Sequence, residues 1–199
     1  MFEKTTNIQG VKVPTFLYGT AWKEDQTQDL TELALRSGFF GIDTANQRKH
    51  YCEEAVGKAI QKNLNQKGMK REDVFLQTKF TSVHGQDHRK PYDESASLDT
   101  QVKQSFLSSL EHLQTGYIDS YVLHGPESYY GWSSSDREIW EAMEGFYQEG
   151  KAKLLGVSNV NFEQLSLLWQ SAKIKPSFVQ NRCFAKTQWD KQVRQFCNE

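Results

Sequence analysis

The chain alternates regularly between short apolar runs and longer segments with helical periodicity. The apolar runs predict six strands, at residues 15–21, 39–43, 74–80, 117–124, 152–158 and 177–183. A helical pattern follows each of them, with apolar residues three or four positions apart on one face, and the last pattern covers residues 190–197. Because this order requires parallel strands joined by helical crossovers, we expect an α/β protein of six βα units.

Local signals set the expected ends of these elements. Residues 7–13, with Gly10 near the middle, predict a small N-terminal hairpin. Gly68 is expected to end the helix after the second strand, and Asn161 to cap the helix after the fifth. The pattern Ser135-x-x-Glu138 predicts a capping box for the helix before the fifth strand.

The order of elements leaves a choice between an open doubly wound sheet and a closed (β/α)₈ barrel. No glycine-rich phosphate loop follows the first strand, where a doubly wound nucleotide-binding protein needs one. We therefore predict a single domain over residues 1–199, with the (β/α)₈ TIM-barrel fold in incomplete form and a short N-terminal hairpin. Such barrels take roughly 250 residues. Six strands leave two unpaired edges, through which the chain could self-associate.

The composition narrows the possible partners and the compartment. Lys and Arg total 24 against 25 Asp and Glu, so no strong field attracts nucleic acid or anionic membranes. There is no signal peptide pattern and no apolar run of about 18 residues, so a cytoplasmic protein without a membrane span is expected. Cys52, Cys183 and Cys197 are odd in number and far apart, which fits reduced thiols without metal-ligand spacing, so no metal is predicted.

Polar residues stand at the carboxyl ends of the predicted strands, where barrel enzymes keep their chemistry. In chain order they are Asp43, Lys79, His124, Ser158 with Asn159, and Gln180. Taken singly, the aspartate could be a helix cap, the histidine a core residue, the lysine a surface ion-pair partner and the asparagine a turn residue. On consecutive strands and with one side-chain parity, the carboxylate, amine and imidazole are instead expected to meet at one mouth.

This group of side chains suits the reduction of a carbonyl by hydride. A buried lysine beside a carboxylate is expected to stay charged and to lower the pKa of a nearby phenol, so Tyr51 could donate a proton near neutral pH. His124 could hold the carbonyl oxygen through a hydrogen bond. The hydroxyl and carboxamide groups of Ser158, Asn159 and Gln180 are the right types to bind an amide such as nicotinamide.

Seven short strings, taken in order, resemble the aldo-keto reductase family. They are GTAW at 19–22, GIDTA at 41–45, EEAVGKAI at 53–60, FLQTKF at 75–80, YIDSYVLHGP at 117–126, GVSN at 156–159 and VQNR at 179–182. The resemblance implies a (β/α)₈ barrel that uses NADP (NADPH) to reduce an aldehyde or ketone to an alcohol. It further implies a catalytic tetrad of Asp43, Tyr51, Lys79 and His124. The implied cofactor contacts are Gly19, Thr20, Asp43, Ser158, Asn159 and Gln180, and the implied substrate contacts are Trp22 and His124.

Two departures from the family pattern keep alternatives open. The usual spacing places the tyrosine five residues after the aspartate, where this chain has Arg48, so His50 is an alternative acid to Tyr51. The family's last two βα units, which hold much of the cofactor, have no counterpart here. The alternatives to an active reductase are a catalytically inactive binding or regulatory module and a non-functional fragment, and a short form that needs a partner over its edges is also possible.

Overall fold

The computed structural model describes residues 4–198, apart from the side chains of residues 66 and 67. The strands are β1 (Thr5–Ile8), β2 (Val11–Pro14), β3 (Tyr18–Gly19), β4 (Gly41–Asp43), β5 (Phe75–Phe80), β6 (Ile118–Leu123), β7 (Ala152–Ser158) and β8 (Phe178–Gln180). β1 and β2 form an antiparallel hairpin, and β3 to β8 form one sheet in chain order, each strand parallel to the next. This is the open half-barrel that the sequence predicted.

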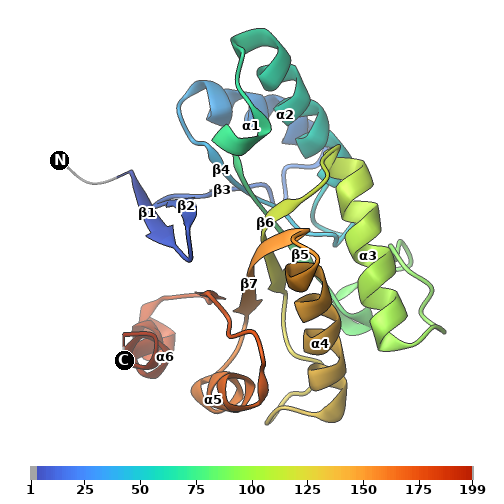
Figure 1. The fold of residues 1–199 in the computed structure, drawn as a ribbon, viewed down its shortest axis with the longest axis vertical. Helices are drawn as coiled ribbons and strands as arrows, with labels where there is room; N and C mark the ends of the chain where they lie inside the picture. The colour runs from blue at the N-terminus through green and yellow to red at the C-terminus, as the bar shows by residue number, and fades with distance from the viewer. Residues whose placement is uncertain (1–3, 199) are drawn as a thin grey trace.

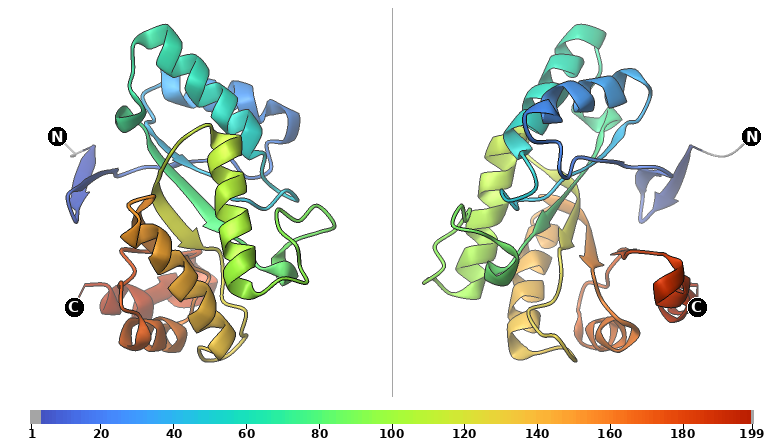
Figure 2. Two further views of the ribbon diagram at one scale, coloured as in Figure 1. Left: turned by 45° about the vertical axis from the view of Figure 1, so that its right-hand side comes forward. Right: turned by 180° about the vertical axis from the view of Figure 1, so that it is seen from behind.

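The helices lie along the outer side of the sheet. They are α1 (Thr27–Arg36), α2 (Glu53–Lys67), α3 (Leu98–Leu113), α4 (Ser134–Gln148), α5 (Phe162–Ser171) and α6 (Lys191–Phe196), with 3₁₀ turns at Glu24–Gln26, Arg71–Asp73, Val83–Gly85 and Ala185–Asp190. In Figures 1 and 2, α1 to α5 form an arc around the strands, and the hairpin and α6 lie across the open side. Within the part of the chain described, none of the helices is long and apolar enough to cross a membrane.

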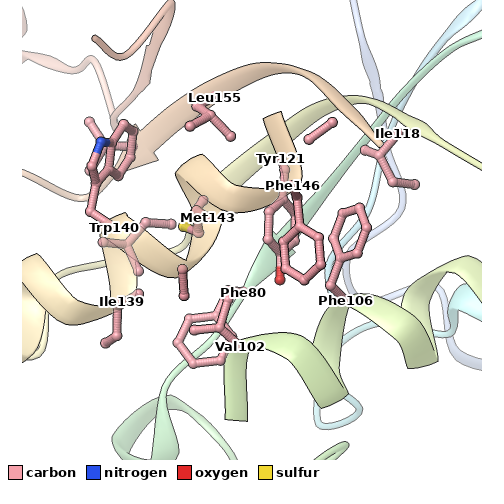
Figure 3. Packing of buried hydrophobic residues seen from close by; sticks show 14 of the residues in the cluster. Phe80, Val102, Phe106, Ile118, Tyr121, Ile139, Trp140, Met143, Phe146 and Leu155 are labelled. Atoms are coloured by element: carbon pink, nitrogen blue, oxygen red, sulfur yellow. The ribbon is translucent and has the colours of Figure 1, made fainter. Parts of the chain in front are cut away.

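The main core lies between the sheet and its helices. Figure 3 shows aromatic side chains from α3, α4 and β6 packed together. Phe106 stacks on Phe146 with ring centroids 4.0 Å apart, and Tyr121 meets Phe106 edge-on at 4.8 Å. All three rings are buried. The apolar side chains of the central strands that point outward pack in this core, and the side chains that point inward form a separate face.

The inner face is apolar near the amino ends of the strands and polar near their carboxyl ends. Val13 of the hairpin packs against Phe75 and Leu154 in a small second cluster, which covers the amino end of the sheet. Further along β5, the inward side chains are Gln77 and Lys79, both buried. The hairpin therefore leaves the polar side chains at the opposite end of the half-barrel.

Several expected element ends are confirmed. The N-terminal hairpin turns at Gln9 and Gly10, both with positive φ. Gly68 ends α2 in the left-handed conformation. Asn161 caps α5 by accepting a hydrogen bond from the Gln164 backbone N–H at 2.8 Å.

Other predicted bounds were wrong. The capping box of α4 is formed by Ser133 and Asp136, not by Ser135 and Glu138, because Ser135 already lies inside the helix. The edge strands β3 and β8 are shorter than predicted, since each has a pairing partner on one side only. β4 starts at Gly41, two residues later than predicted.

Candidate active site

An ion pair between Asp43 and Lys79 lies at the carboxyl ends of β4 and β5. Lys79 Nζ donates to Asp43 Oδ1 at 2.5 Å and to the Thr44 carbonyl at 2.8 Å. The Lys79 side chain is 2% exposed and the Asp43 side chain is 10% exposed. Burial lowers the pKa of Lys79, and the Asp43 carboxylate opposes that shift. A charged ammonium group is tolerated at this depth because the carboxylate is its direct partner.

The Asp43 carboxylate is also the acceptor for two carboxamides on the inner face. Gln77 Nε2 donates to Asp43 Oδ1 at 2.8 Å, and Gln180 Nε2 donates to Oδ2 at 3.2 Å. Ser120 donates its hydroxyl to Gln77 Oε1 at 2.9 Å. These bonds connect β4, β5, β6 and β8 across the half-barrel. The sequence pattern did not predict that Gln77 joins the aspartate to the serine.

His124 follows β6 directly and is held by a neighbouring hydroxyl. Its Nδ1 lies 2.7 Å from Thr81 Oγ1, a contact that the sequence did not predict. Burial, helped by the charge of Lys79, lowers the pKa of His124 to about 4, so the ring is neutral at pH 7. A neutral ring that accepts the Thr81 hydroxyl at Nδ1 carries its proton at Nε2, where it can donate to a substrate oxygen.

Tyr51 brings its ring next to both of these groups. Lys79 Nζ lies 5.4 Å from the centroid of the Tyr51 ring, and the ring centroids of Tyr51 and His124 are 5.9 Å apart in an edge-on arrangement. The four predicted tetrad residues are therefore neighbours in the folded chain. The longer spacing between Asp43 and Tyr51 does not keep the phenol away from the lysine.

The expected direction of the Tyr51 pKa shift was wrong. Burial first, and the negative charge of Asp43 second, raise the pKa of Tyr51 to about 12. The Lys79 ammonium, which pairs with Asp43 at 2.5 Å, does not reverse this shift. The phenol therefore stays protonated at neutral pH.

Ser158 and Asn159 connect the ends of β6, β7 and β8. Ser158 Oγ donates to the Gln180 carbonyl at 2.6 Å, and Asn159 Nδ2 donates to the His124 carbonyl at 2.8 Å. Asn159 has a positive φ of 56°, a conformation that asparagine tolerates better than most residues. These polar groups lie beside the tetrad, as predicted from their strand positions.

The remaining predicted contacts come from the β3 end. Gly19 pairs with Asp43 in the strand register, and Thr20 donates both its backbone N–H and its hydroxyl to the Asp43 carbonyl, at 3.0 and 2.9 Å. Trp22 is 68% exposed and stacks on His50 with ring centroids 3.6 Å apart. Trp22, His50 and Tyr51 line one cavity of about 660 Å³, whose lining does not include Asp43, Lys79 or His124.

One buried carboxylate near the tetrad was not predicted. Glu53, at the start of α2, is 4% exposed and accepts a hydrogen bond from the Thr78 hydroxyl at 2.5 Å. His112 of α3 lies 3.5 Å from its second oxygen. A glutamate in the first turn of a helix resembles an ordinary helix-dipole partner in sequence, so the pattern alone gave no signal.

Comparison with known proteins assigns residues 15–199 to the Aldo/keto reductase family. An uncharacterized oxidoreductase, YtbE, of Bacillus subtilis is 32% identical over 181 residues, 89% of this chain and 57% of the relative. Glyoxal reductase of the same bacterium is 31% identical over 193 residues, 94% of this chain and 60% of the relative.

Solved structures show the same fold. The aldo-keto reductase AKR2E4 of Bombyx mori in complex with NADP superposes with a TM-score of 0.77 at 23% identity, over 96% of this chain and 63% of that one. An aldo/keto reductase from Brucella melitensis gives 0.74 at 27% identity, over 97% and 69%. The chain belongs to the aldo/keto reductase family, and it spans a little over half the length of the curated relatives it matches.

Proposed function

We propose that this chain carries the proton-transfer site of an NADPH-dependent reductase that converts an aldehyde or ketone to an alcohol. The observation that supports the proposal most strongly is the buried Lys79 and Asp43 pair, with the Tyr51 ring and the His124 ring beside it. Asp43 ends β4 and Tyr51 lies in the loop after it, Lys79 is near the end of β5, and His124 follows β6 directly. A protein named glyoxal reductase is among the relatives.

The roles follow from the charge state of each group. His124 is neutral at pH 7, so Nε2–H can donate to the carbonyl oxygen without adding a charge to the pocket. The phenol of Tyr51 is protonated, so it can give its proton to the oxygen as negative charge develops there. Lys79 lies beside the Tyr51 ring, 5.4 Å from its centroid, and Asp43 holds the lysine in place.

The residues at the ends of β7 and β8 fit a nicotinamide amide in chemical type. Ser158, Asn159 and Gln180 offer a hydroxyl and two carboxamides, which can donate to or accept from an amide. A reduced nicotinamide, when bound, supplies the hydride that the carbonyl carbon needs. We propose NADPH as the cofactor because a structural neighbour was solved with NADP and because these side chains border the tetrad.

A second candidate function is a binding module that keeps the tetrad without turnover. The observation that favours it is that Ser158, Asn159 and Gln180 already make hydrogen bonds within the chain, which compete with a nicotinamide amide and so oppose turnover. To bind an amide, these groups must exchange internal partners for the ligand. The same half-barrel edge offers a surface for a second copy of the chain, which is the self-association that the open sheet suggests.

A matched pair of tyrosine variants separates the two candidates. The purified chain is titrated with NADPH by fluorescence, and NADPH oxidation with glyoxal or benzaldehyde is followed by absorbance. We expect Tyr51→Phe to lower turnover at least 100-fold with little change in NADPH affinity, whereas Tyr130→Phe, at a ring 83% exposed, leaves both unchanged. NADPH binding without oxidation by the wild-type chain would favour the binding module.

A further inference from the structure

Glu53 joins the two segments that hold the tyrosine and the lysine. It follows Tyr51 by two residues, at the first position of α2. Its Oε1 accepts the hydroxyl hydrogen bond from Thr78, which directly precedes Lys79 on β5. Alternate residues of a strand face opposite sides, so Thr78 points outward to Glu53 while Lys79 points inward to Asp43. A single carboxylate thereby fixes the loop of Tyr51 against the strand of Lys79.

Glu53 is a buried carboxylate whose charge acts on neighbouring groups. It is 4% exposed, and its Oε2 is buried without a hydrogen-bond partner among the described residues, with His112 Nδ1 at 3.5 Å. The negative charge of Glu53 opposes the lowering of the Lys79 pKa by burial. The charged and titratable groups packed closest to Glu53 are His112 of α3, Glu54 of α2, Lys79 of β5 and Tyr121 of β6. The cavity that Glu53 shares is also lined by Glu24, Asp25, Arg48, Lys49, His50, Tyr51, Cys52 and Arg89.

We infer that Glu53 is a positioning residue of the proposed reductase site, which holds the Tyr51 loop on β5 and supports the ammonium form of Lys79. This inference rests on the proposed function for its catalytic consequence. The effect of Glu53 on Lys79 does not depend on the proposed function and can be tested without turnover. A glutamate that served only as a helix N-terminal charge would contact neither β5 nor α3.

Three variants separate the hydrogen bond from the charge. Glu53→Gln keeps an oxygen acceptor for Thr78 and removes the charge. Thr78→Val keeps the charge and removes the hydroxyl. Glu54→Gln is the matched control, because Glu54 is the exposed neighbour that also lies near His112, at 3.6 Å. Circular dichroism and urea unfolding establish that each variant folds before any other comparison is made.

The first readout is independent of activity. The side-chain titration of Lys79 is followed by NMR on ¹³C-lysine-labelled protein, with the signal assigned by its loss in Lys79→Met. We expect Glu53→Gln to lower the apparent pKa of Lys79, because the change removes a negative charge that opposes the effect of burial. Thr78→Val and Glu54→Gln should leave the apparent pKa of Lys79 unchanged. An unchanged Lys79 titration in folded Glu53→Gln would overturn the inference.

The second readout is turnover with NADPH and an aldehyde. Glu53→Gln should lower kcat about tenfold and move the alkaline limb of the kcat profile to lower pH, with KM within about twofold. Thr78→Val should lower kcat several-fold without moving that limb. Equal kcat in Glu53→Gln and Glu54→Gln would contradict the catalytic part. A wild-type chain that oxidises no NADPH, but shows the Lys79 shift, would refute the proposed function and retain the positioning role.

Discussion

The central strands and the edge strands of the half-barrel differ in how firmly they hold their polar residues. β5 and β6 are buried along their whole length, whereas β3 has two residues and the three residues of β8 are only half-buried. The buried strands carry Asp43 and Lys79, and one of them leads directly to His124. Gln180, which the proposed cofactor contact needs, lies on the edge. The residues proposed for proton transfer are thus built into the interior, and the residues proposed for cofactor contact lie at the open side.

The physical reason for this difference is the number of neighbours. A central strand has a partner on each side and a helix on its outer face, so its backbone and side chains are fixed by several contacts at once. β8 pairs with β7 alone, and the chain beyond it passes through three consecutive residues with positive φ, Gln188 to Asp190, before α6. A region with fewer contacts opens more readily, and ligand contacts made there are easier to change.

The largest expected effect compares a central with an edge phenylalanine. Phe106 is fully buried and stacked on Phe146, whereas Phe178 of β8 is only half-buried. We expect Phe106→Ala to cost about 3–5 kcal/mol of unfolding free energy, from lost packing and a residual cavity, and Phe178→Ala only about 1–2 kcal/mol. Urea unfolding measures both. Equal losses would contradict the division into a firm centre and a looser edge.

A second prediction concerns the buried ion pair. Lys79→Met leaves the Asp43 carboxylate without its ammonium partner, which we expect to cost about 3 kcal/mol of unfolding free energy. The double variant Asp43→Asn with Lys79→Met removes both charges, so it should be more stable than Lys79→Met alone. If the double variant loses the sum of the two single losses, the charges do not interact as the structure indicates.

The third prediction uses pH to compare a buried with an exposed histidine. The pKa of His124 is about 4 in the folded chain, below the ordinary value of about 6.5 for an unfolded histidine. Between these values the unfolded chain binds more protons, so the stability that His124 contributes is complete above pH 6.5 and falls as the pH drops toward 4, by roughly 2–3 kcal/mol. His124→Asn should flatten this dependence in urea unfolding, and His84→Gln, in an exposed loop, should not.

The smallest effects come from two helical glycines. A Cβ at Gly57 of α2 would lie 2.1 Å from the His112 carbonyl oxygen of α3, whereas a Cβ at Gly145 of α4 has nothing within 4 Å. We expect Gly57→Ala to cost about 1–3 kcal/mol by forcing the two helices apart. Gly145→Ala should stabilise the chain by about 0.5–1 kcal/mol through helix propensity. Thermal or urea unfolding distinguishes a loss from a gain.

The sequence was sufficient for the order of elements and for the strand ends that carry Asp43, Lys79 and His124. These follow from periodicity and from the rule that barrel chemistry gathers at carboxyl ends. The pKa of Tyr51 was predicted in the wrong direction because the pattern of residues does not reveal how deeply the phenol is buried or how close it lies to Asp43. The lengths of β3 and β8 were overestimated because apolar residues predict a strand whether or not it finds two partners. Glu53 escaped notice for a similar reason, since its contacts with β5 and α3 are distant in sequence.

The most direct test of the central claim is the oxidation of NADPH by an aldehyde, followed at 340 nm. It compares the wild-type and Lys79→Met chains, after both are shown to be folded and both are titrated with NADPH. The account predicts measurable oxidation by the wild type and a rate at least 1,000-fold lower, on the order of 4 kcal/mol of barrier, in Lys79→Met with NADPH affinity nearly unchanged. Equal rates in the two proteins, or NADPH bound but not oxidised by the wild type, would contradict it.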